Sequence, residues 1–301
     1  CDPSTGEEAC ARSFIPKFGR RAFRRALSDA EVTTLFTVYQ TDRNDGDADF
    51  NDGIGAVLET ILQSAPFLYR PEFGTSAGAG SVALSSHEMA TRLSYTLWNS
   101  LPDAELDAAA DADQLRAPDQ VAAQARRLLA DPRALTSLHD FFDQWLGAGN
   151  LAKVNKDAEL FPEFSADMQR SMDGELHAFL DDVMSAGGGT LEALLTAPVS
   201  FLDKNTGSLY GMAGLSDVPQ KVMLDASQRA GILTQPSLMA IYSSPNQTSP
   251  VPRGKFVLER LLCQELPPPP PGLVTTAPDL QPGSTARQRF ADLLGRLGFE
   301  E

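Results

Sequence analysis

The sequence predicts an all-α protein, a multi-helix orthogonal or bundle-like array of ten or more helices with at most one or two very short strands. Apolar residues recur at helical spacing along most of the chain, as they do from Met168 to Val183. Serine, aspartate or proline precedes many of these segments and glycine follows several of them, as is typical of helix starts and stops. No series of strands alternates with helices, so a parallel sheet is not expected.

The composition predicts a folded and strongly acidic protein. The chain has 301 residues, of which 42% are hydrophobic, and this is enough for one large core or two modest domains. Its net charge of −15 repels nucleic acid and anionic membrane surfaces, so neither is expected as a partner. No apolar run reaches the roughly 20 residues of a membrane helix. We expect no signal peptide in a chain that reads as a mature protein or a fragment.

Residues 1–72 are predicted to form an N-terminal helical domain that starts with a short cysteine loop. Cys1 and Cys10 enclose a segment with a proline and a glycine, and a disulfide between them would indicate an oxidising compartment. Two unrelated thiols, or a lipidated Cys1 of a mature lipoprotein, remain alternatives.

The first predicted helix, residues 8–26, carries phenylalanines on one side and a basic stripe on the other. In an acidic protein such a stripe could bind an anion or the acidic surface of a partner. The simpler interpretation is a solvated face paired with the protein's own carboxylates. The stripe consists of Arg12, Lys17, Arg20, Arg21, Arg24 and Arg25. A second helix then begins at a capping box formed by Ser28 and Glu31.

An acidic loop, residues 42–53, precedes the next apolar helix and carries part of a calcium-loop pattern. Asp47, Asp49 and Asn51 occupy alternate positions, which makes calcium a candidate cofactor. The loop glycine, Gly53, comes one residue late, and the twelfth position is leucine in place of glutamate. The simpler interpretation is a helix-capping loop with solvated carboxylates.

Residues 73–86 form a predicted linker of small residues, which leads into a central helical domain at residues 87–215. The linker contains Gly74–Gly78, a hydrolase nucleophile pattern, and Gly78–Gly80, part of a dinucleotide-binding pattern. Neither is flanked by the strand and helix that these motifs need, so we expect a flexible linker. The longest helix of the central domain is predicted at residues 165–185.

The extended segments are predicted to be few and short. Residues 199–202 form a brief extended piece, and residues 221–224 are the best strand candidate. The second of these lies in the C-terminal helical domain, residues 216–301. Residues 228–242 are predicted to be helical in two parts, broken around Pro236.

The most unusual stretch of the chain runs from residue 248 to residue 273. A helix of about a dozen residues is predicted there, and Arg253 and Lys255 lie at its start, where two cations would suit a phosphate or carboxylate. The alternative is that both charges pair with acidic neighbours. Residues 267–271 are consecutive prolines and predict a polyproline II strap.

Neither the histidines nor Cys263 predicts a reactive centre. His87, His139 and His177 lie in separate predicted helices without a partner at ligand spacing, so each is expected to be structural. Cys263 follows a leucine pair on an amphipathic helix and is expected to be a buried, inert thiol. The carboxylates are too abundant to single out an acid–base pair.

Three segments of the chain resemble a set of uncharacterised domains from large secreted proteins of planctomycetes and myxobacteria. The first is similar in CARSFIPKFGRRAFRRALSDAEV and FNDGIGAVLETILQSAPFLYR. The second is similar in ATRLSYTLWNSLPDAEL, FFDQWLG and LLTAPVSFLDKNTGSLYG. The third, RAGILTQPSLMAIYSSPNQTSPVPRGKFVLERLLCQELPPPPPGL, is the most specific match.

The resemblance implies an extracytoplasmic protein, which would be periplasmic, secreted or an outer-membrane lipoprotein. Family members of unknown function often carry a c-type haem motif, CxxCH, after the polyproline segment, or are associated with cytochrome-like domains. Here LGRLGFEE follows at that place without cysteine or histidine, so covalent haem is not supported by this sequence.

The sequence therefore predicts a helical scaffold or interaction module of an extracytoplasmic, haem-linked redox protein. Its expected partners are other domains of the same parent protein or a cytochrome-like protein. The alternative is an enzyme that acts on an extracellular substrate such as a polymer. That alternative requires a cleft in which Arg253, Lys255 and some carboxylates converge.

Overall fold

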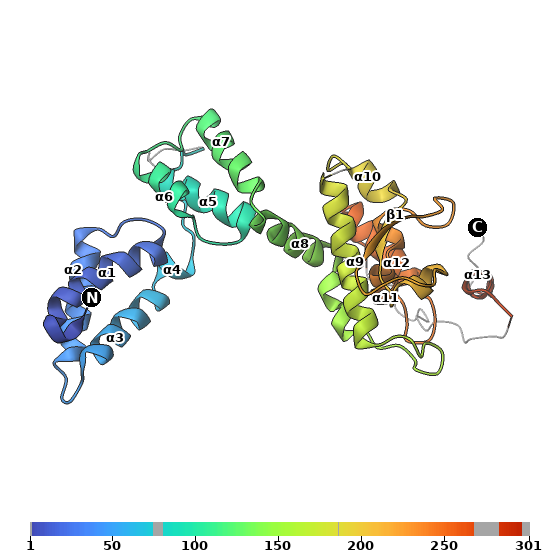
Figure 1. Cartoon of the computed structure of the whole chain (residues 1–301), viewed down its shortest axis with the longest axis horizontal. Coiled ribbons are helices and arrows are strands. Elements are labelled where there is room, and N and C mark those ends of the chain that lie inside the picture. Colours follow the sequence, from blue (N-terminus) through green and yellow to red (C-terminus); the bar gives the residue numbers. More distant parts are fainter. Residues whose placement is uncertain (1, 75–80, 186, 268–282, 297–301) are drawn as a thin grey trace. The chain divides into compact units, whose positions relative to one another are not determined.

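The computed structural model describes residues 2–74, 81–185, 187–267 and 283–296, and it divides into two compact units, Cys1–Leu138 and His139–Glu301 (Figure 1). Its described residues are mainly helical and contain one two-stranded antiparallel sheet, which confirms the mainly α class. Among the helices of the described ranges, none is both long enough and apolar enough to cross a membrane.

Unit 1 consists of a short 3₁₀ turn followed by helices. These are η1 (Pro3–Thr5), α1 (Glu7–Phe23), α2 (Asp29–Arg43), α3 (Phe50–Gln63), α4 (Ala65–Leu68), α5 (Ser86–Trp98), α6 (Ala104–Asp111), α7 (Pro118–Leu129) and the start of α8 (Arg133–Leu146). Most predicted helix starts are confirmed, because the caps that the sequence indicates are formed. At α2, Ser28 Oγ accepts from the Glu31 backbone N–H while the Glu31 carboxylate accepts from the Ser28 N–H.

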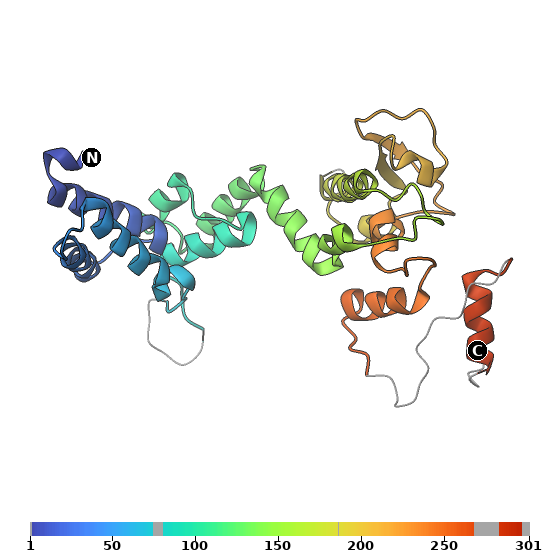
Figure 2. The same ribbon diagram turned by 90° about the horizontal axis from the view of Figure 1, so that it is seen from below.

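The first core of unit 1 lies where α1, α2 and α3 pack side by side (Figures 1 and 2). Ile15, Val57 and Ile61 are fully buried there, and Tyr39 packs beside them. The apolar stripes predicted from helical spacing meet in this core, and burial of such side chains stabilises the folded state by about 1.5–3 kcal/mol each.

The second core of unit 1 is built on α5, α6 and α7 around Trp98. The Trp98 indole N–H donates to the Leu128 carbonyl oxygen at 2.8 Å, and the Arg133 guanidinium lies 3.5 Å from the indole centroid. Asp103 caps α6 through the Leu106 N–H and also accepts two hydrogen bonds from Arg127. These contacts tie the three helices together at their ends.

Unit 2 contains the remaining elements. They are the rest of α8, η2 (Ala148–Lys153), α9 (Ala166–Ser185), α10 (Leu191–Thr196), β1 (Val199–Leu202), η3 (Gly207–Tyr210), β2 (Gln220–Met223), η4 (Ile232–Thr234), α11 (Pro236–Ile241), α12 (Pro250–Phe256), the π-helical turn η5 (Val257–Leu261) and α13 (Ala286–Arg296). The strands pair with Val199 opposite Met223 and Leu202 opposite Gln220, which confirms both predicted extended segments.

The long helix α9 forms the centre of unit 2, as its predicted apolar stripe indicates. Leu176, Phe179 and Leu180 are fully buried, and α9 contacts both β1 and α11. The helix predicted at residues 228–242 is shorter than expected. Only a 3₁₀ turn precedes Pro236, and α11 starts at that proline.

Helix α8 ends where the predicted glycine signal places its end. Gly147 has φ +72°, a left-handed conformation that glycine adopts without strain. The Tyr242 hydroxyl donates to the Leu146 carbonyl oxygen at 2.7 Å, and a side chain on Gly147 would come within 3.0 Å of that hydroxyl. The glycine therefore lets α11 approach the end of α8.

Candidate functional site

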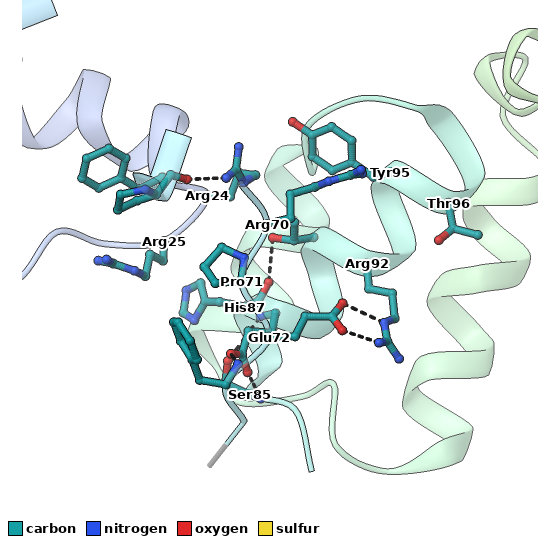
Figure 3. Close-up of a pocket in the computed structure, with 15 residues that line it drawn as sticks. Arg24, Arg25, Arg70, Pro71, Glu72, Ser85, His87, Arg92, Tyr95 and Thr96 are labelled. Carbon is teal, nitrogen blue, oxygen red and sulfur yellow. Dashed lines mark hydrogen bonds and ion pairs between the residues drawn. The ribbon is translucent and has the colours of Figure 1, made fainter. Parts of the chain in front are cut away.

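A cavity of about 610 Å³ in unit 1 has four arginines in its lining. We call it the arginine pocket (Figure 3). It lies between the C-terminal end of α1, the segment after α4, and α5. Its charged lining residues are Arg24, Arg25, Arg70, Glu72, Glu88 and Arg92.

Arg24 is buried at one side of this pocket, although it carries a charge. It caps α1 in a left-handed conformation, φ 57°, and its side chain is enclosed beneath α4. Its guanidinium donates to the carbonyl oxygens of Pro66 and Tyr69, at 2.5 and 2.8 Å. These acceptors are uncharged carbonyl oxygens of α4 and of the residue after it, so they stabilise the cation without neutralising it.

Arg70 supplies a second positive charge that carboxylates leave unpaired. Its guanidinium lies 4.5 Å from the centroid of the Tyr95 ring and is exposed. Within the described ranges, no carboxylate forms an ion pair with Arg70 or with Arg24. An arginine held flat on an aromatic ring keeps its edge donors free for a planar anion.

The other two arginines of the pocket are paired. Arg25 forms two hydrogen bonds with Glu31, at 2.7 and 2.9 Å, and these bonds hold the pKa of that carboxyl at about 2. Arg92 pairs with Glu72. Glu88 is occupied as well, because its oxygens accept from the backbone N–H groups of residues 73, 74 and 85. The net positive charge of the lining thus comes from Arg24 and Arg70.

The basic stripe predicted on the first helix is divided by the structure. Arg20 pairs with Asp111 at 2.8 Å and Arg25 with Glu31, which matches the interpretation that carboxylates pair with the stripe. Arg12 lies over the Phe36 ring at 3.6 Å. Arg24 departs from that interpretation, since it turns into the pocket.

A second cavity, of about 520 Å³, lies in unit 2 and is mainly apolar. Phe161, Phe164, Met172, Leu209 and Met239 contribute to its wall, with Lys156 and Arg229 as the cations. Lys156 Nζ donates to carbonyl oxygens of Ala240, Ser243 and Ser244 and to the Ser243 hydroxyl. Burial lowers the Lys156 pKa. Its donors hold the loop after α11, so this lysine has a structural task.

Glu175 is a buried carboxyl next to this region, on α9. Ser200 of β1 donates to its Oε1 at 2.5 Å, Tyr210 donates to the same atom, and Oε2 has no partner. Burial raises the pKa of Glu175 to about 7. The carboxyl therefore joins β1 and η3 to α9 and titrates near neutral pH.

The predicted anion site at Arg253 and Lys255 is not assembled as one pair of cations. Arg253 turns back to donate to Thr248 Oγ1 at 2.7 Å, and its Nε is buried without a partner. Lys255 is exposed and lies 3.5 Å from Glu259. Side chains two residues apart on a helix point to different faces, which explains the separation.

The residues of the predicted calcium loop serve as a helix cap. Asp49 accepts from the backbone N–H groups of Asn51 and Asp52, at 2.7 and 3.1 Å. The carboxylate of Asp52 accepts in return from the Asp49 N–H. Asp47 is exposed. The capping interpretation is thus observed, and calcium binding stays a prediction.

The cysteines fall partly outside the described residues. Cys1 is among the residues that the structure does not describe, so the predicted Cys1–Cys10 disulfide stays a prediction, while Cys10 is buried in α1. Cys263 is exposed, which corrects the expectation of a buried thiol. The helical turn ends at Leu261, and Cys263 follows it in a left-handed conformation with φ 52°, so Cys263 does not lie on the apolar face of the helix.

The three histidines, expected to be structural, have partners in the fold that their spacing in the sequence does not indicate. His139 and His177 stack with ring centroids 4.3 Å apart, and each ring contacts an aspartate. His87 contacts Asp111. The two stacked rings belong to different helices, so their spacing in sequence gives no direct signal.

Three consecutive family models match the chain in the order of the resemblance. Residues 10–72 match "Protein of unknown function (DUF1595)", residues 84–212 match "Protein of unknown function (DUF1592)" and residues 229–295 match "Protein of unknown function (DUF1588)". The matched ranges contain the segments on which the resemblance rests. No curated protein and no solved structure matches the chain.

Proposed function

The chain consists of three consecutive planctomycete-type, cytochrome-associated domains of unknown function, and we propose that it is a helical interaction module whose arginine pocket binds a carboxylate-bearing peptide segment. The proposal rests on two guanidinium groups beside one cavity, those of Arg24 and Arg70. Neither forms an ion pair with a carboxylate of the described residues. In a chain of net charge −15, such a local excess of positive charge selects acidic groups.

The parent assembly that we propose is an extracytoplasmic, haem-linked redox protein. The association of these families with cytochrome-like domains supports this proposal, as does the predicted disulfide. The acidic segment would then belong to another domain of the same parent protein or to a cytochrome-like partner. In this arrangement the haem is held by the partner, and the chain itself positions it.

The residues on which the enzyme alternative depends do not support it. It required Arg253, Lys255 and carboxylates to converge, whereas Arg253 turns to Thr248 and Lys255 to Glu259. The interaction module is therefore the function that we propose.

Binding of a fluorescently labelled hexaglutamate peptide, measured by anisotropy at low salt, tests the pocket. Arg70→Ala should weaken binding about three- to tenfold, because one exposed charge-assisted contact contributes about 1 kcal/mol. Arg21→Ala, which removes the same charge from an exposed position on α1, is the matched control and should bind as the wild type does. Equal affinities of the wild type and Arg70→Ala would refute the proposal.

Three further measurements sharpen the result. A peptide of neutral residues should not bind, and tighter binding of an oligogalacturonate than of the peptide would assign the pocket to acidic polysaccharide instead. An absorption spectrum of the chain, produced in the periplasm of a haem-competent host, should show no Soret band. A stoichiometric Soret band would replace the interaction module by a chain that carries haem itself.

A further inference from the structure

Two helices of unit 2 face each other with aligned stripes of histidine and aspartate. Helix α8 carries His139 and Asp143, four residues apart. Helix α9 carries Asp173, His177 and Asp181, again at four-residue steps. Side chains at this spacing lie on one face of a helix, and the ring contact between His139 and His177 shows that the two faces meet.

His177 lies between two carboxylates. Its Nε2 is 3.0 Å from an Asp143 oxygen and its Nδ1 is 3.6 Å from an Asp173 oxygen. One ligand atom from each of these three residues lies within 4.8 Å of the other two, and all three side chains are half-buried. Among the described residues, these are the only three metal-ligand side chains found this close together.

When His177 is neutral, the arrangement contains more acceptors than donors. A neutral imidazole has one N–H and one lone pair, so it can donate to only one of the two carboxylates that face it. The other carboxylate then faces a nitrogen lone pair. Within the described residues, the ion pairs of Asp143, Asp173 and Asp181 are with histidines, and none is with a lysine or an arginine. A cation in the space between the three ligand atoms removes both the repulsion and the excess of negative charge.

We propose that Asp143, Asp173 and His177 bind one divalent transition-metal ion. A mixed set of imidazole and carboxylate ligands suits Zn²⁺, Mn²⁺ or Fe²⁺ better than Ca²⁺ or Mg²⁺, which prefer oxygen alone. Ligand bonds of about 2.1 Å require small side-chain rotations to bring the three atoms closer together. Three protein ligands leave positions open for water or another ligand.

His139 is a positioning residue of this site. It stacks on the His177 ring with an interplanar angle of 16°, and its Nε2 is 2.7 Å from an Asp181 oxygen. The nitrogen lone pairs of His139 lie in its own ring plane, nearly parallel to that of His177, and its Nε2 faces Asp181, so His139 supports the ligand ring and is not itself a ligand. The bound ion would link α8 to α9 within unit 2, independently of the arginine pocket.

Titration of Zn²⁺ against a competing chromophoric indicator tests the site, with the full chain prepared without a polyhistidine tag and treated with a chelator. The wild type should bind one equivalent. At a free Zn²⁺ concentration one hundred times Kd, the Tm of unit 2 should rise by roughly 5–10 °C. Co²⁺ should give the visible absorption of a nitrogen- and oxygen-ligated ion, a readout that needs no variant.

Three variants separate a built site from a merely acidic surface. His177→Ala and Asp143→Asn should each lower Zn²⁺ affinity at least tenfold while far-ultraviolet circular dichroism stays unchanged. His87→Ala is the matched control, because His87 also contacts one aspartate, Asp111, but lacks the second carboxylate. It should bind Zn²⁺ as the wild type does.

The assignment is overturned by any of three results. These are binding without saturation near one equivalent, equal Zn²⁺ affinity of the wild type and both ligand variants, and tighter binding of Ca²⁺ than of Zn²⁺. The first two results would mean that these side chains pair with one another and form no specific Zn²⁺ site, and the third would mean a site of oxygen ligands for a hard cation.

Discussion

Replacing Glu175 by Gln should remove a pH dependence from the stability of unit 2. The carboxyl pKa is raised by burial from its ordinary value of 4.5 to about 7, so the folded unit binds this proton more tightly than the unfolded chain does. The stability that this proton contributes is fully present below pH 4.5 and is lost as pH rises to about 7. The shift corresponds to about 3 kcal/mol of unfolding free energy.

The substitution is chosen because it preserves the contacts of Glu175. The Gln carbonyl oxygen can still accept from Ser200 and Tyr210, while the amide does not ionise. At pH 5 the wild type and Glu175→Gln should therefore have similar stability. At pH 8 the variant should be more stable by about 2–3 kcal/mol.

Urea unfolding at pH 5 and pH 8, followed by tryptophan fluorescence, measures this difference. Both proteins would carry Trp98→Phe, so that Trp145 alone reports, and it reports on unit 2. Glu192→Gln makes the same chemical change at an exposed position of α10 and serves as the matched control. It should leave the pH dependence of the wild type unchanged.

The reasoning is refuted if Glu175→Gln and the wild type lose equal stability between pH 5 and pH 8. Such a result would mean that the folded unit holds Glu175 ionised at both pH values. Other titrating groups do not affect this test, because they are common to both proteins and cancel in the comparison.

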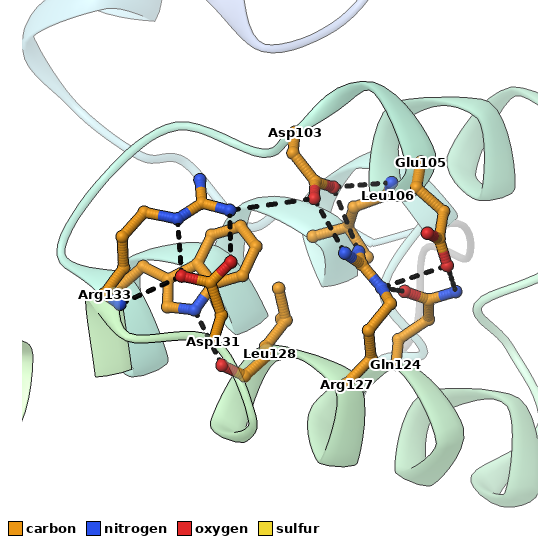
Figure 4. Close-up of polar contacts among 9 residues, drawn as sticks. Asp103, Glu105, Leu106, Gln124, Arg127, Leu128, Asp131 and Arg133 are labelled. Carbon is orange, nitrogen blue, oxygen red and sulfur yellow. Dashed lines mark hydrogen bonds and ion pairs between the residues drawn. The ribbon is translucent and has the colours of Figure 1, made fainter. Parts of the chain in front are cut away.

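Three further predictions follow from single contacts. Gly231→Ala should destabilise unit 2 by about 3 kcal/mol or more in thermal unfolding, because φ is +63° and a Cβ would lie 2.0 Å from a carbonyl oxygen of α10. Asp103→Ala should lower the unfolding free energy of unit 1 by about 2 kcal/mol in urea, because it removes the cap of α6 and the ion pair with Arg127 (Figure 4). Maleimide labelling without reductant should modify Cys263 alone, in native and in denatured protein, because it is exposed and the Cys1–Cys10 pair is expected to be a disulfide.

Each of these three predictions has a control variant or an outcome that would contradict it. Gly211→Ala has a similar φ of +68° but open space around the new Cβ, so it should cost only about 1 kcal/mol. Asp103→Asn keeps a capping oxygen and should recover about half of the loss. A third labelled equivalent in denatured, unreduced protein would show that Cys1 and Cys10 are free thiols.

The sequence predicted the features of this protein that depend on residues close together in the chain. The capping box of Ser28 and Glu31, the long helix α9 and the extended segments that become β1 and β2 were all expected from local patterns. The order of the three family domains was also contained in the sequence. Hydrogen bonds within a few residues and the spacing of apolar side chains decide such features, so no knowledge of distant residues is needed.

Only the tertiary structure decided which polar side chains meet. The carbonyl oxygens that accept hydrogen bonds from Arg24 lie more than forty residues along the chain, at Pro66 and Tyr69. His139 and His177 belong to two helices, and the carboxyl of Glu175 is buried by a strand and a turn that follow it. Helical spacing shows which side chains share a face, but the partner of that face is set by packing. The charge state and the ligands of a side chain depend on that partner. For this reason, the arginine pocket and the group of Asp143, Asp173 and His177 can be recognised only in the tertiary structure.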